Sequence, residues 1–131
     1  MTDAVMVPVS VGELFDKISI LEIKSERLND RAKVANVNEE LRLLRSIAVG
    51  VQIDDQIAFA HIVAKLKAVN ESIWAAEDAI RDHENRQAFD DSFLAVARSI
   101  YRLNDARAAA KREMNVLMKS RIFEEKSYAK Y

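Results

Sequence analysis

Apolar side chains recur along most of this chain at alternating steps of four and three residues, the spacing that places them on one face of an α-helix. Short polar segments separate four such stretches. The first two stretches run through Leu14, Ile18, Leu21, Ser25 and Leu28, and through Leu41, Leu44 and Ile47. The third and fourth are longer and more regular, from Phe59 to Ile80 and from Val96 to Leu117. The pattern predicts four main helices.

Capping residues set the expected boundaries of the first two helices. Ser10 and Glu13 form a capping box, so we expect the first helix to begin there and to run to about Lys33. The polar residues 36–40 predict a break and a new cap. A short second helix would then end at Gly50.

The second half of the chain predicts a long helical hairpin. Asp54 or Asp55 caps a third helix that runs to about Arg86, roughly 48 Å at 1.5 Å per residue. The acidic and hydroxyl side chains of residues 90–92 cap a fourth helix that continues through Leu117. Because the link between these helices is short, we expect them to run antiparallel.

The two ends of the chain are expected to lie outside the helices. Valines at positions 5, 7, 9 and 11 alternate with other residues around Pro8, which predicts an extended arm over residues 1–10. The tail, residues 120–131, is charged and carries Phe123, Tyr128 and Tyr131, and it is either docked or frayed. We predict a single domain over residues 1–131.

Composition supports the helical interpretation. The 131 residues include two glycines and one proline, where average usage would give roughly sixteen. A sheet protein of this length would need more tight turns than these residues allow. We therefore predict an all-α, antiparallel helical bundle of four main helices with an extended N-terminal arm and a long C-terminal helical hairpin.

Charge and leader signals exclude several classes of protein. A net charge of -1 argues against binding to nucleic acid or anionic lipid through bulk charge. The chain has no cysteine, no basic signal-peptide start and no apolar run of membrane-spanning length, so we expect a cytoplasmic protein. Charge is uneven, however: the balance is -5 over residues 71–91 and +4 over residues 102–131. We expect these two segments to lie beside each other and to neutralise one another.

Polar side chains follow the edges of the apolar stripes on three predicted helices. These candidate site residues are Glu22 on the first helix, Glu77 and Arg81 on the third, and Asn104, Arg107 and Lys111 on the fourth. One hypothesis is a structural ion-pair network that fixes the register of the helices. The other is a pocket in which Arg107 and Lys111 hold an anionic ligand while Glu22 or Glu77 accepts a proton.

Other chemistry has weaker support in the sequence. His61 and His83 are not part of Glu-x-x-His pairs, so a carboxylate-bridged metal centre is not predicted. Glu13 and Asp16 form one acidic pair at i and i+3, without a matching pair on a second helix. Glycine-rich phosphate loops and Ser-His-Asp arrangements are absent from the sequence. We expect no metal and no cofactor.

Four segments together resemble the DUF6165 family, a bacterial family of small proteins of unknown function: residues 9–24, 74–81, 97–108 and 124–128. The candidate site residues fall within these segments or just beyond them. The resemblance implies a bacterial protein and a link to cell-surface polysaccharide synthesis.

Two functions remain open from the sequence. The first is a non-enzymatic interaction or accessory protein, and the length of the third helix predicts a homodimer that covers its far end. The alternative is a small-molecule enzyme or binder that recognises an anionic ligand in the polar seam between the first, third and fourth helices.

Overall fold

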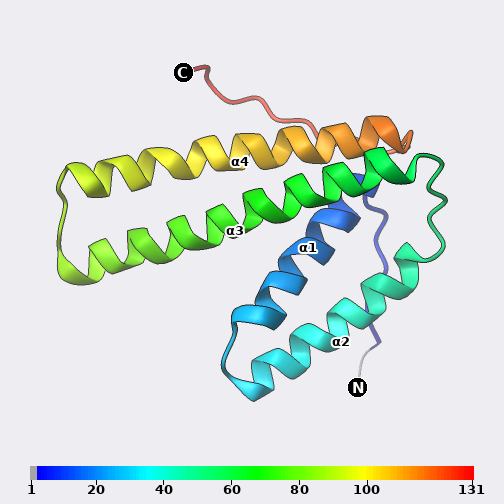
Figure 1. Ribbon diagram of the computed structural model, residues 1–131, viewed down its shortest axis with the longest axis horizontal. Helices are drawn as coiled ribbons and strands as arrows, with labels where there is room; N and C mark the ends of the chain where they lie inside the picture. Colours follow the sequence, from blue (N-terminus) through cyan, green and yellow to red (C-terminus); the bar gives the residue numbers. More distant parts are fainter. Residues whose placement is uncertain (1–2) are drawn as a thin grey trace.

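The computed structural model describes residues 3–131 and contains the helices α1 (Val11–Arg27), α2 (Arg31–Ala48), α3 (Gln56–Arg86) and α4 (Asp91–Leu117) (Figure 1). No strand occurs in this range, so the predicted all-α class and the four main helices are confirmed. None of these helices combines the length and the apolar content needed to cross a membrane. Of the predicted arm, residues 3–9 are non-helical and exposed, and residues 1–2 lie outside the described part of the chain.

The helices form two hairpins of unequal length (Figure 1). α3 and α4 lie side by side with opposite chain directions, and α1 packs against both of them near one end of this long hairpin. Among the described helices, α2 contacts α1 alone. The far end of the α3–α4 hairpin therefore projects beyond α1 and α2.

This arrangement gives two small apolar cores in place of one shared core. Leu14, Ile18 and Leu21 of α1 pack with Val37 and Leu41 of α2. The second core is formed by Ile62, Leu66, Ala110 and Met114, which α3 and α4 contribute in equal number. Phe15 packs against both clusters, and its ring meets that of Phe59 edge-to-face at 4.8 Å. α1 is thus the element that joins the two hairpins.

The long hairpin has the predicted boundaries. Asp55 caps α3 by accepting a hydrogen bond from the Ala58 backbone N–H at 3.0 Å, and Asp90 caps α4 through Phe93 in the same way at 2.9 Å. Gln87 ends α3 in the left-handed conformation, at φ 53°. Regular apolar spacing combined with a strong cap at each start was sufficient to locate both helices.

The predicted boundary between the first two helices is wrong. α1 ends at Arg27 rather than near Lys33, and Leu28 is already extended. Asp30 then caps α2 by accepting from the N–H groups of Ala32 and Lys33. α2 is consequently 18 residues long rather than short, and the asparagines at 36 and 38 lie on its exposed face.

Candidate functional site

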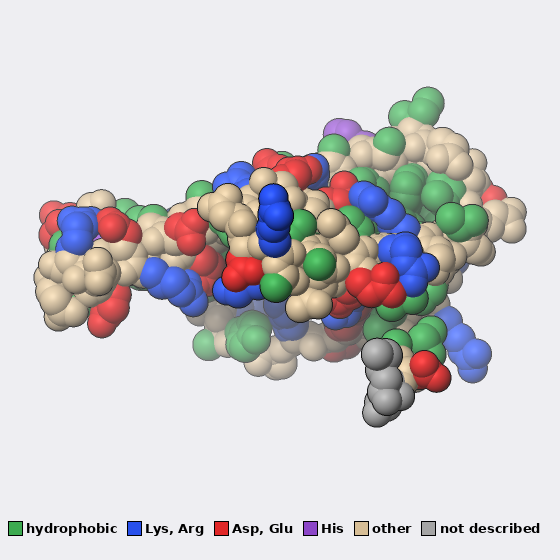
Figure 2. Space-filling view, turned by 90° about the horizontal axis from the view of Figure 1, so that it is seen from below, with side chains coloured by type: hydrophobic (Ala, Val, Ile, Leu, Met, Phe, Trp, Pro, Cys, Tyr) green, Lys and Arg blue, Asp and Glu red, His purple; other side chains and the backbone are tan. Residues whose placement is uncertain are grey.

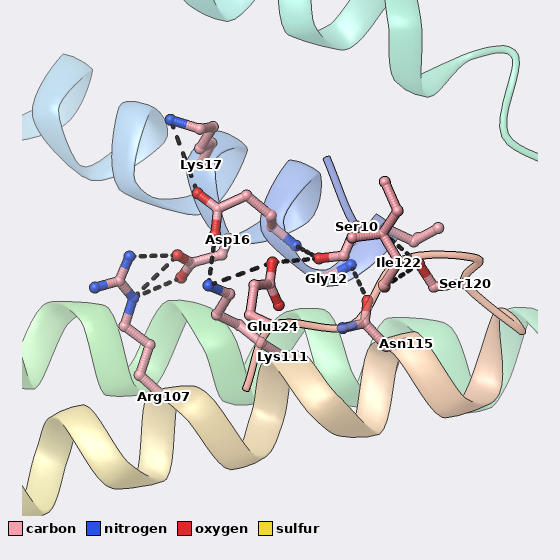
Figure 3. Close-up of polar contacts among 12 residues, drawn as sticks. Ser10, Gly12, Asp16, Lys17, Arg107, Lys111, Asn115, Ser120, Ile122 and Glu124 are labelled. Atoms are coloured by element: carbon pink, nitrogen blue, oxygen red, sulfur yellow. Dashed lines mark hydrogen bonds and ion pairs between the residues drawn. The ribbon is translucent and has the colours of Figure 1, made fainter. Parts of the chain in front are cut away.

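A buried ion pair connects α1 to α4. The Asp16 carboxylate has no solvent exposure, and the Arg107 guanidinium donates to it from Nε at 3.1 and 3.0 Å and from Nη2 at 2.5 Å (Figure 3). Asn70 of α3 donates to the same carboxylate at 2.9 Å and to Ser19 at 3.4 Å. The hydrogen bonds to Asp16 raise the pKa of Arg107, against the opposing effect of burial. Three helices therefore meet at one charged group.

A second ion pair lies one helical turn along α4. Lys111 Nζ is 2.5 Å from Glu13 of α1 and 3.9 Å from Glu124 of the tail. Glu124 also accepts a hydrogen bond from the Ser10 hydroxyl at 2.5 Å, and that hydroxyl accepts from the Glu13 backbone N–H at 3.0 Å. Ser10 thus caps α1 and holds the tail at the same time.

Burial alone would raise the pKa of Glu124. The hydrogen bond from Ser10 and the positive charge of Lys111 outweigh burial, and the pKa of the Glu124 carboxyl is lowered. The charged form of this carboxylate is therefore favoured in the folded protein.

The first turn of α1 lies very close to α4. The Gly12 N–H donates to Asn115 Oδ1 at 2.6 Å, and the Val11 N–H donates to the Ser120 hydroxyl at 3.1 Å (Figure 3). A Cβ atom on Gly12 would lie 2.4 Å from the backbone oxygen of Lys111. Glycine is required here because no side chain fits between the two backbones.

The six predicted site residues do not form one cluster. Arg107 and Lys111 belong to the network, but their partners are Asp16 and Glu13 rather than Glu22 or Glu77. The remaining four make other contacts: Glu22 faces Arg45 of α2 at 3.8 Å, Glu77 pairs with Arg81 within α3, and Asn104 donates to the Ile100 carbonyl at 3.1 Å. Neither expected proton acceptor forms an ion pair with Arg107 or Lys111 in the described chain.

Part of the predicted set does share a cavity. Arg107, Glu77 and Arg81 line a pocket of about 410 Å³ between α1, α3 and α4, together with Trp74 and Ile23. Asp78 also lines it, so two acidic side chains balance the two basic ones. The side chains that line the pocket therefore carry no net charge.

The expected neutralisation between the charged segments is wrong. Lys65 of α3 lies 3.1 Å from Glu113 of α4, which shows that the basic part of α4 faces the first half of α3. Residues 71–91 instead occupy the far half of the hairpin, and within the described chain no ion pair joins them to residues 102–131. The long hairpin therefore keeps an acidic far end and a basic near end, and Figure 2 shows the acidic side chains gathered at the far end.

Comparison with known proteins gives a family and no activity. In residues 3–131 no group of three or more histidine, cysteine, aspartate or glutamate side chains is placed to hold a metal ion. No curated protein and no solved structure matches the chain. A family model does match over residues 5–131, and this protein belongs to that family, DUF6165, a family of unknown function.

Proposed function

We propose that the protein is a non-enzymatic interaction protein that docks through the far half of the α3–α4 hairpin. We call residues 71–106 the distal hairpin. The observation that carries the proposal is its burial: within this segment, His83 is the only buried residue. In the near half, α1 covers the same apolar stripe, and Ile62, Leu66, Ala110 and Met114 are all buried.

The distal hairpin carries apolar residues that no other helix of the chain buries fully. Ile73, Ile80, Ile100 and Leu103 continue the stripe and are only half-buried. Near the turn, Phe89 is 55% exposed and Leu94 is 54% exposed. Covering such side chains removes apolar area from water, at about 25 cal/mol for each Å². Docking that covers these side chains is therefore favourable.

A second copy of the chain is the partner that the charges favour. The distal hairpin carries the acidic segment 71–91, and the near end of α4 with the tail carries the basic segment 102–131. Two copies packed antiparallel would bring the acidic end of each hairpin towards the basic end of the other. An isologous arrangement of this kind satisfies both ends at once.

Sedimentation equilibrium at micromolar concentration tests this proposal. We expect twice the chain mass of 14.9 kDa for the wild type and a single-chain mass for Leu94→Glu. Leu43→Glu, which places the same charge on an exposed position of α2, is the matched control and should stay dimeric. A monomeric wild type would refute the homodimer. Dissociation of both variants to the same extent would show that the distal hairpin is not the dimer surface.

The second candidate function is binding of an anionic ligand in the pocket between α1, α3 and α4. Arg107 favours it, because this side chain is 31% exposed and its Nη1 group makes no hydrogen bond within residues 3–131. A melting-temperature screen with anionic metabolites tests it, with Arg81→Gln as the variant. A rise in melting temperature with one of these metabolites that is lost in Arg81→Gln would support binding in this pocket. The link to cell-surface polysaccharide synthesis stays a prediction.

A further inference from the structure

A groove of about 930 Å³ runs along α4 beneath the C-terminal tail, and its α4 side includes the last residues of the distal hairpin. Tyr101 and Asn104 line it on the α4 side, and Lys126, Tyr128 and Tyr131 line it on the tail side. At one end it continues into a notch of about 100 Å³, which shares Asn104, Ala108 and Lys126 with the groove. The combined space is in the size range of small-molecule sites.

The notch is rich in cations. Its basic side chains are Arg107, Lys111, Arg112 and Lys126, and its one acidic side chain is Glu124. That carboxylate rests against Lys111 and the Ser10 hydroxyl. The notch therefore already holds an anion, and this anion belongs to the protein's own tail.

One cation in the notch has no acidic partner. Within the described residues Lys126 makes no ion pair and lies only over the Tyr128 ring, at 5.8 Å. A carboxylate has two oxygens to offer, whereas a phosphate offers three acceptor oxygens and more charge. A phosphate group can thus use donors that Glu124 leaves free.

The tail that supplies the carboxylate is weakly held. Residues 121–131 are all exposed and form no helix or strand. Their polar links to the helices are those of Glu124, a pair between Glu125 and Arg112 at 3.3 Å, and a hydrogen bond from Tyr131 to Asp105 at 2.6 Å. Exposed pairs of this kind contribute about 1 kcal/mol or less each. The tail can therefore open while the helices stay folded.

The other end of the groove is aromatic. The Tyr101 and Tyr131 rings meet edge-to-face with centroids 5.1 Å apart, and Tyr128 also lines the groove. All three rings are substantially exposed. Flat aromatic side chains spaced along a groove offer stacking surfaces to a planar ring.

We infer that the tail groove binds a small molecule that joins a phosphate group to a planar ring, with the phosphate replacing the Glu124 carboxylate in the cationic notch and the ring lying among the tyrosines. In this arrangement Glu124 is an internal competitor for the ligand. Its side chain occupies the anion position until the ligand arrives.

Phenyl phosphate is the probe, and binding is followed by backbone amide chemical shifts of the ¹⁵N-labelled full-length protein. We expect shifts at Glu124, at Lys126 and at Gly12, which follows the Ser10 cap. Inorganic phosphate should bind about tenfold more weakly, because it lacks the ring. Benzyl alcohol, which carries the ring without the charge, should give no shift in the notch. Benzoate carries the ring with a carboxylate, so it distinguishes a site for phosphate from a site for any carboxylate.

Glu124→Gln is the decisive variant because it tests the competition between Glu124 and the ligand directly. If Glu124 competes with the ligand, removing its charge tightens phenyl phosphate binding by about threefold to fivefold. Lys126→Gln should weaken binding by a similar factor, and Arg121→Gln, an exposed charge outside the groove, should leave it unchanged. Absence of notch shifts in both the wild type and Glu124→Gln, or affinity for benzoate equal to that for phenyl phosphate, would overturn the proposal.

Discussion

Replacing Arg107 by methionine removes the cation that faces the fully buried Asp16 carboxylate. Methionine fills much of the same space, so the change isolates the loss of charge and hydrogen bonds. Asn70 would remain as a neutral donor to Asp16. The variant therefore leaves a charged group inside the protein with one of its two partners.

The expected loss in the free energy of unfolding is about 3 kcal/mol. Breaking a buried ion pair by removing one partner costs about 3–5 kcal/mol. The lower end applies here because Arg107 is 31% exposed and water can reach the vacated position.

Urea unfolding followed by far-ultraviolet circular dichroism measures this loss. With an m-value near 2 kcal/mol/M, we expect the midpoint to fall by about 1.5 M. Arg81→Met is the matched control, since Arg81 is 70% exposed and pairs only within α3. It should change the free energy of unfolding by about 0.5 kcal/mol or less.

A double-mutant cycle with Asp16→Asn separates the pair from other effects of the substitution. We expect a coupling energy of about 2 kcal/mol between positions 16 and 107. A loss below about 1 kcal/mol for Arg107→Met, or a loss no larger than that of Arg81→Met, would refute the argument that this pair joins α1 to the hairpin.

Three further changes test the contacts around the start of α1. Gly12→Ala should cost about 2 kcal/mol in urea unfolding because its Cβ would meet the Lys111 backbone, whereas Gly50→Ala, whose Cβ would only touch Ile47 at 3.4 Å, should be nearly neutral. Ser10→Ala should lower the free energy of unfolding by about 1 kcal/mol because the cap of α1 is lost. It should also speed cleavage of the tail by carboxypeptidase, and unchanged cleavage would contradict the link between Ser10 and Glu124. The lowered pKa of Glu124 means that its stabilising contribution is present above the ordinary glutamate pKa and is lost as the pH falls through the lowered pKa of the folded state. Amide exchange in residues 121–131 should accelerate over that fall in pH, and less so in Glu124→Gln.

The long hairpin was predictable because local signals agreed over its whole length. Asp55 and Asp90 cap helices whose interiors contain neither glycine nor proline, and the apolar spacing is interrupted only at Arg107. The α1–α2 boundary lacked such agreement. Leu28 continues the stripe of α1 in the sequence but packs on the core from an extended position, while Asp30 acts as a cap inside an otherwise helical pattern. The two hydrogen bonds that the Asp30 side chain accepts fix where α2 begins.

The partners of Arg107 and Lys111 could not be predicted from helical spacing. Spacing along one helix defines a face, but the crossing angle between helices decides which part of that face reaches a neighbour. α1 meets α4 only through its first half, so Glu13 and Asp16 lie against the basic side chains of α4. Glu22 lies two turns further along and faces α2. The acidic pair at positions 13 and 16 was the available signal.

The same crossing geometry explains why the hairpin is left uncovered. Gly12 allows the start of α1 to touch the α4 backbone near Lys111, and Asp16 fixes the next turn to Arg107. From that point α1 builds its own core with α2, while its last turn reaches α3 through the pair between Glu26 and Lys67 at 2.9 Å. In this position α1 covers the near half of the long hairpin and leaves the apolar stripe beyond Asn70 only half-buried. The buried polar contacts at the start of α1 help to fix that position, and the exposure of the distal hairpin follows from it.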